Sequence, residues 1–275
     1  MEKELDDFKC TLEAAIIAMQ KAGTIKDFYE MAEFTEREQQ LKDYITKHGV
    51  TFFVTHPIGD DEFRVNSGVF QQRVPNLAQE LYIDFRLLET LVRNHLNDGY
   101  TIMKISFREI TDNTINEFSR MMPEENQLLL KSVKGYLYAT LSFHEAADTT
   151  RLDKHYFVFN LDRYYEVDVS QFGSFDSTDL GRTLTNASND AYVANSIRYD
   201  LILVKQYIDR IHMYLEGCLQ KNVSRLDFIP CIGKKKTVSV GTGKESVYLA
   251  TMPSDNNKQL FSADFPYYDQ GSLEP

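Results

Sequence analysis

The residues best suited to chemistry lie near the middle of the chain. They are His144, Glu145, Asp148 and His155. Imidazole nitrogens and carboxylate oxygens bind metals, and the same groups exchange protons in acid–base catalysis. Strands predicted over 136–144 and 155–161 would bring the two histidines together across a hairpin. Because the spacing matches no metal-binding motif, surface histidines near a turn are the competing interpretation, and we predict no metal and no cofactor.

A glycine-rich segment, 241–246, carries a lysine and could suggest a phosphate-binding loop. A Walker A motif needs an earlier glycine where Val238 stands and Ser or Thr where Glu245 stands. The turn preference of glycine therefore favours a hairpin turn. No GxSxG or SxxK nucleophile motif is present either. Distant residues can still assemble a catalytic site, so an enzyme using His144 or His155 with nearby acids is an alternative function.

Net charge gives the main functional signal. The chain has 41 acidic and 30 basic residues, a formal net charge of −11. Direct binding to nucleic acid is disfavoured, because that affinity comes largely from Lys and Arg on phosphates. The same charge attracts a basic protein partner and accelerates the encounter. Simple solubility is the competing interpretation.

Seven acids are the predicted partner-binding residues, placed at a turn, along one strand face and in a long loop. They are Asp60, Asp61, Glu62, Glu166, Asp168, Asp176 and Asp179. If they share one side of the fold, they form a carboxylate array that Arg and Lys side chains recognise. Scattered, solvated acids are the competing interpretation.

The first half of the chain reads as helices followed by mixed elements. Helical spacing predicts a helix over 3–21, closed by Gly23, and further helices up to residue 49. Strands are predicted at 50–56 and 62–74, followed by a helix over 75–99. A strand around Met103 to Phe107 and two short helices, opened by Asp112 and Pro123, come next.

The second half begins with aromatic-rich strands. An antiparallel meander is predicted over 136–144, 155–161 and 164–170, with one apolar face for helices to cover. A long polar loop then precedes an amphipathic helix over 190–221. Its repeating apolar positions are Ile197, Leu201, Val204, Ile208, Ile211 and Leu215. These six predict a dimer interface, with the central helix of the chain's own core as the alternative.

Short strands are predicted at 225–231, 237–241 and 245–252, and the aromatic tail after Pro253 is either a strap or a disordered terminus. The predicted class is α+β, with antiparallel sheets and helices packed on one face. Two parts are predicted, 1–175 and 176–275, with a single domain as the alternative.

Cysteine content and hydropathy indicate a cytoplasmic protein. The three cysteines have no CxxC spacing, so no disulfide framework is predicted, and Cys10 and Cys218 are expected in the core. The N-terminus is charged where a signal peptide is apolar, and no apolar run reaches the roughly 18 residues of a membrane span.

In size, acidity, cytosolic character and lack of catalytic motifs, the whole chain resembles giant-bacteriophage proteins that bind the host RNA degradosome and inhibit its ribonuclease E. The resemblance carries over no individual residue. It implies a homodimer that occupies RNA-binding segments of ribonuclease E and protects transcripts from decay. We therefore expect a non-enzymatic, acidic protein of the host cytoplasm that competes with RNA. A structural component of a viral assembly is a further alternative.

Overall fold

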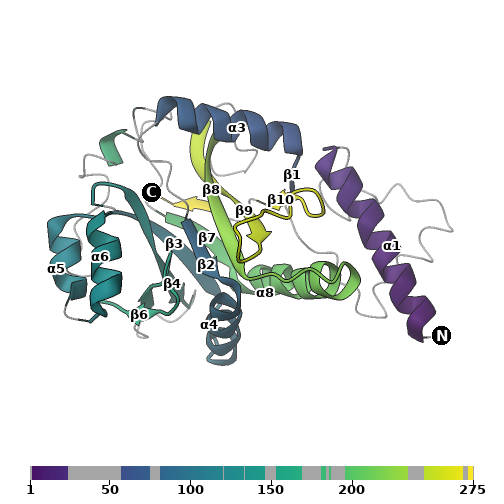
Figure 1. Ribbon diagram of the computed structural model, residues 1–275, viewed down its shortest axis with the longest axis horizontal. Coiled ribbons are helices and arrows are strands. Elements are labelled where there is room, and N and C mark those ends of the chain that lie inside the picture. The colour runs from purple at the N-terminus through teal and green to yellow at the C-terminus, as the bar shows by residue number, and fades with distance from the viewer. Residues whose placement is uncertain are drawn as a thin grey trace.

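The computed structural model combines helices with two antiparallel sheets, so the predicted α+β class is confirmed (Figure 1). It describes residues 2–23, 57–74, 81–119, 121–132, 134–145, 153–168, 181–183, 186, 196–234, 245–268 and 272–274. The predictions for residues 24–56, for strand 237–241 and for Asp176 and Asp179 lie outside these ranges. In the described ranges, no helix is both long and apolar enough to span a membrane.

The first sheet has the strand order β1-β10-β9-β8-β2 among the described residues. Its strands are β1 (Pro57–Ile58), β2 (Leu81–Asp84), β8 (Arg225–Lys234), β9 (Glu245–Ser254) and β10 (Tyr267–Tyr268). β8 and β9 pair over their full length, from Arg225 opposite Ser254 to Lys234 opposite Glu245. The glycine-rich segment is therefore followed by a strand, whereas a phosphate-binding loop opens a helix.

The second sheet has the order β11-β7-β3-β4-β5-β6. Its strands are β3 (Ile102–Glu109), β4 (Leu137–His144), β5 (Lys154–Phe157), β6 (Tyr165–Glu166), β7 (Ser196–Asp200) and β11 (Ser272–Glu274). The predicted meander is confirmed by the antiparallel pairs β4–β5 and β5–β6. The expectation that only one face is covered is wrong for β4, which is buried on both faces from Leu137 to Phe143.

The described helices surround the sheets. They are α1 (Glu2–Lys21), α3 (Asp60–Arg73), α4 (Phe85–Asn97), α5 (Asp112–Ser119), α6 (Glu124–Ser132), α8 (Leu201–Arg210) and the π-helix η4 (Ile211–Cys218). Figure 1 places α5 and α6 at one end of the molecule and α1 at the other. The predicted helices over 3–21, from Asp112 and from Pro123 are confirmed as α1, α5 and α6.

The strand predicted over 62–74 is wrong, because this segment forms α3. Its acids stand in the first turn, where they interact favourably with the positive end of the helix dipole. Phe70 and Val74 are both buried at a spacing that suits one helix face. α3 packs on β8, where a Cβ at Gly233 would collide with the side chain of Asn66.

The helix predicted over 75–99 begins later than expected. Leu81 lies in β2, and α4 starts at Phe85 because the Asp84 carboxylate accepts a hydrogen bond from the backbone N–H of Leu87 at 2.8 Å. The predicted inward face of this helix is otherwise correct, with Leu88 and Val92 buried.

The long helix predicted over 190–221 is also wrong in its first part. Residues 196–200 form β7, and the helix opens at Leu201, where Asp200 caps the backbone N–H of Ile202 at 3.0 Å. The six positions proposed as a dimer interface are at most 5% exposed within this chain: Ile197, Leu201, Val204, Ile208, Ile211 and Leu215. Their side chains therefore fill the chain's own core and are not presented to a second subunit.

The two predicted parts of the chain share both sheets. β2 pairs with β8, and β3 pairs with β7, so each sheet combines strands from 1–175 and 176–275. The aromatic tail straps this core. Its members are all buried: Phe261, Phe265, Tyr267 and Tyr268.

The cysteine prediction is wrong, because Cys10 of α1 is disulfide-bonded to Cys218 of η4. Local spacing could not reveal the bond, since the two residues are 208 positions apart and meet only when α1 packs on η4. Cys231 is not part of this disulfide and is buried, with its thiol 3.6 Å from the Ile229 carbonyl.

A neutral histidine joins α4 to the second sheet and predicts a pH dependence. The His95 ring stacks on Phe143 at 3.8 Å, and its nitrogens lie 2.7 Å from the Leu91 carbonyl and 3.0 Å from the Tyr156 hydroxyl. Burial lowers the pKa of His95 below 6.5, partly offset by the hydrogen bond to Leu91. Burial also raises the pKa of Tyr156 to about 12, so its hydroxyl stays protonated.

Because the folded pKa of His95 is depressed, its stabilising contribution is present above pH 6.5 and is lost as the pH falls below this value. Urea denaturation across this range should show the folded chain losing stability towards low pH. The stability difference between wild type and His95→Gln should shrink in parallel. A difference that does not change with pH would contradict the assignment.

Candidate interaction surface

The structure places the predicted partner-binding acids at separate sites. Asp60, Asp61 and Glu62 form the first turn of α3. Glu166 lies on β6, and Asp168 follows it at the edge of the second sheet. In Figure 1, α3 lies along the top of the molecule and β6 near the bottom. These five described acids therefore do not form one array.

Two of these acids have partners nearby. Asp60 forms an ion pair with Lys21 of α1 at 3.4 Å, and Glu166 forms one with Lys154 of β5 at 2.9 Å. The Glu166 hydrogen bond raises the pKa of Lys154. Water screens the exposed Lys154–Glu166 pair, so Glu166 can exchange Lys154 for a cation of a partner, whereas the Lys21–Asp60 pair is partly buried between α1 and α3.

Exposed apolar side chains reveal a surface that the sequence analysis missed. Leu128 is 58% exposed, Tyr164 46% and Met121 45%. Leu128 and Met121 lie on and just before α6, whose first turn carries the exposed acids Glu124 and Glu125. Apolar groups rimmed by charge mark interaction sites more often than isolated exposed residues do.

Tyr165 connects α6 to the β5–β6 hairpin. Its hydroxyl accepts a hydrogen bond from the Asn126 side chain at 3.0 Å. The adjacent Tyr164 meets Tyr156 edge-to-face, with ring centroids 5.1 Å apart. This hydrogen bond joins the helix to the hairpin, and we name the exposed residues of the two elements the α6–β6 surface. It consists of Met121, Glu124, Glu125, Leu128, Tyr164 and Glu166.

Acids near the hairpin turn stabilise the charge of Arg163. The pKa of Arg163 is raised, first by its hydrogen bond to Asp162 and then by charge interactions that include Glu125. Glu125 of α6 therefore acts on the hairpin turn as well as on its own helix. A cationic side chain arriving from a partner would meet the same negative field.

No family model, curated protein or solved structure matches this chain. A functional proposal therefore depends on the chemistry of its surfaces, because fold class alone does not specify function.

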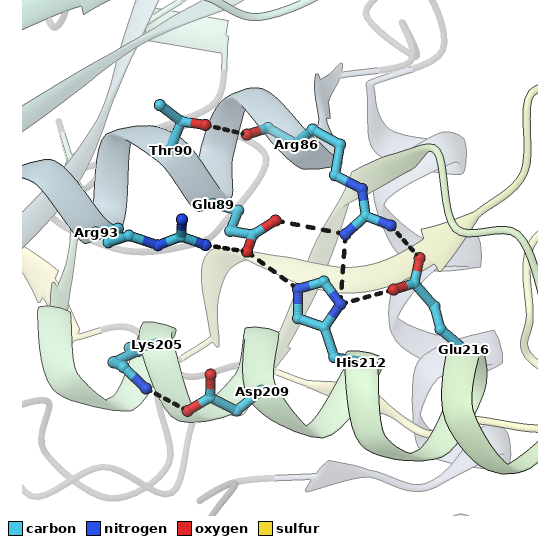
Figure 2. Close-up of polar contacts among 8 residues, drawn as sticks. All are labelled: Arg86, Glu89, Thr90, Arg93, Lys205, Asp209, His212 and Glu216. Carbon is cyan, nitrogen blue, oxygen red and sulfur yellow. Dashed lines mark hydrogen bonds and ion pairs between the residues drawn. The ribbon is translucent and has the colours of Figure 1, made fainter.

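A second polar cluster lies between α4 and η4, and Figure 2 shows its side chains converging. Arg86 contacts Glu216 at 2.6 Å, and His212 lies 2.6 Å from Glu216 and 3.4 Å from Glu89. Arg93 forms a further ion pair with Glu89. Each carboxylate thus has cationic neighbours within the cluster, which suits a bridge between two helices. Within the described ranges, no His, Cys, Asp and Glu side chains form a group of three or more that could hold a metal.

The predicted approach of the two histidines is confirmed. His144 on β4 and His155 on β5 have ring centroids 5.5 Å apart, with the rings nearly perpendicular. Asp148, one of the two acids proposed with them, lies outside the described residues, whereas Asp153 contacts His144 at 2.8 Å.

Proposed function

We propose that this chain binds a basic, amphipathic segment of another protein through the α6–β6 surface. The supporting observation is the exposure of Leu128 on the helix that carries Glu124 and Glu125, and of Tyr164 two residues from Glu166. Apolar anchors supply burial on binding, and the acidic rim supplies steering and selectivity for Lys and Arg.

The apolar anchors and the acidic rim together indicate which kind of partner segment would bind. Segments that bind RNA combine Arg and Lys with apolar or aromatic residues, so they suit an acidic surface with apolar anchors. An occupied segment cannot bind RNA at the same time, and the chain then acts as a competitor of RNA. Ribonuclease E is the partner that the resemblance to degradosome inhibitors implies, and the homodimer that it implies remains a prediction.

The acids of α6 can be tested against a matched control. We expect Glu124→Gln with Glu125→Gln to weaken binding of a fluorescein-labelled, arginine-rich amphipathic peptide roughly fivefold, about 1 kcal/mol. Its affinity should also become less sensitive to salt, because two attractive charges are gone. Fluorescence anisotropy at low and moderate salt measures both effects.

The control is Asp61→Asn with Glu62→Gln. This pair also removes two exposed first-turn acids from a helix, so net charge and helix-dipole effects are matched. It should leave peptide affinity nearly unchanged. Equal weakening by the two double variants would mean that only net charge matters, and the α6–β6 surface would be rejected.

A further inference from the structure

The N-terminal helix α1 packs on the rest of the described chain mainly through one stripe of its surface. The buried side chains follow the spacing of one helix face, whereas the alanines beside them are exposed. They are Glu13, Ile16, Ile17 and Gln20. Cys10 stands three positions before Glu13 on the same stripe and is half-buried. One face of α1 thus carries a disulfide, a carboxylate, two apolar side chains and an amide.

This stripe rests on a cationic and aromatic surface, which we name the α1 docking surface. It consists of Arg210, Tyr214, Phe265 and Tyr268. The Arg210 guanidinium forms an ion pair with Glu13 and donates a hydrogen bond to Gln20 Oε1 at 3.2 Å. Its carbon lies 5.6 Å from the ring centroids of both Phe265 and Tyr268. The surface therefore suits an amphipathic helix that directs a carboxylate at Arg210.

The non-covalent contacts leave α1 exchangeable. Glu13 Oε2 is buried and has no hydrogen-bond partner within the described part of the chain. A buried carboxylate oxygen without a partner is unfavourable. Undocking of α1 uncovers Glu13 and Arg210 together, so neither charge is left buried without the other. The ion pair therefore selects which helix fits, and the disulfide decides whether α1 stays.

The disulfide holds the end of α1 that lies far from its other anchor. Lys21, in the last turn, pairs with Asp60 of α3 at 3.4 Å. Cys10 lies eleven positions earlier, about 16 Å along the helix axis. Cys10 and Cys218 are both half-buried, whereas Cys231 is buried. The bond is therefore within reach of a small thiol in the folded chain.

We propose that the Cys10–Cys218 bond is a redox switch, whose reduction opens the α1 docking surface to an amphipathic, carboxylate-bearing helix of another protein. A dithiol supplies the two electrons. One of its thiolates attacks a sulfur of the bond, its second thiol completes the exchange, and it leaves as a disulfide while Cys10 and Cys218 become thiols. In the cytoplasm that the sequence predicts, thiols are kept reduced, and disulfides there are usually transient or redox-sensing.

A fluorescein-labelled peptide of residues 2–21 with Cys10→Ser tests this surface on the full-length chain. Fluorescence anisotropy should show binding to the chain reduced with dithiothreitol. Binding to the oxidised chain should be roughly tenfold weaker or more, because the tethered α1 occupies the surface at high effective concentration. Glu13→Gln in the peptide should weaken binding to the reduced chain roughly tenfold, since a charge-assisted contact with Arg210 is lost.

A second peptide, with Glu13→Gln and Ala14→Glu, keeps the net charge and moves the carboxylate to the exposed side of the helix. It should bind as weakly as the peptide with Glu13→Gln alone. If it binds as tightly as the peptide with Glu13, recognition of a directed carboxylate by Arg210 is rejected. Equal binding of the Glu13 peptide to reduced and oxidised chain overturns the switch.

Circular dichroism of the reduced chain distinguishes local release of α1 from unfolding. The reduced chain should keep its far-UV spectrum, and loss of that spectrum would overturn the switch, because the bond would then hold the whole fold. The arginine-rich peptide offered to the α6–β6 surface should bind oxidised and reduced chain alike, since α6 and α1 lie at opposite ends of the molecule (Figure 1). Failure of either surface is thus seen separately from failure of the other.

Discussion

Replacing Glu13 with Gln should lower the free energy of unfolding by about 3–5 kcal/mol, because it leaves Arg210 buried without a counter-charge. Both side chains are fully buried, and they form an ion pair between α1 and α8. Arg210 also donates hydrogen bonds to Tyr268 of β10 and, at 3.2 Å, to Gln20 of α1. One guanidinium therefore joins the N-terminal helix, the central helix and the C-terminal strap.

The ionisation of this pair is mutually dependent. Burial raises the pKa of Glu13, and the charge of Arg210 opposes that rise. Burial lowers the pKa of Arg210, but the charge of Glu13 and further interactions raise it above its ordinary value overall. Each charge is thus tolerated in the interior because the other is present.

Urea denaturation measures the effect, and an exposed pair on the same helix provides the control. Lys205 and Asp209 form an ion pair in which both side chains are about half exposed. Asp209→Asn should change stability by no more than about 0.5 kcal/mol. A double variant, Glu13→Leu with Arg210→Met, should recover much of the loss, because apolar residues of similar size can replace a buried pair. A loss below about 1 kcal/mol for Glu13→Gln would show that the interior solvates Arg210 without Glu13.

Local periodicity predicted those elements whose own residues decide their structure. The alternation around Met103 to Phe107 identified β3, and the capping and spacing from Asp112 identified α5. The prediction was wrong around Ile197. Ile197 and Leu201 are four positions apart, which suits one continuous helix, but Ile197 belongs to β7 and Leu201 begins α8. Pairing with β3 determines that strand, and such long-range contacts leave no local pattern.

In the candidate sites, too, local sequence predicted some features and long-range packing decided the others. The proximity of His144 and His155 followed from the predicted hairpin. The exposure of Leu128 was hidden, because a helical pattern does not tell which apolar side chain the rest of the fold leaves uncovered.

Reduction of the Cys10–Cys218 disulfide should lower the free energy of unfolding by about 2–5 kcal/mol. The bond joins residues 208 positions apart, so it restricts a very long loop in the unfolded chain. In the folded chain it holds α1 against η4, near the contact between Glu13 and Arg210. Hydrogen exchange should therefore show α1 opening more readily once the bond is reduced.

Denaturation with and without dithiothreitol measures this effect, and Cys10→Ser with Cys218→Ser is the control. The double variant should resemble the reduced wild type in stability and should not respond to the reductant. Cys231 remains in both proteins as a buried thiol, so it cannot account for a difference between them. If reduced and oxidised wild type unfold at the same urea concentration, Glu13, Arg210 and the apolar face of α1 alone fix this helix, and the disulfide adds nothing to the stability of the fold.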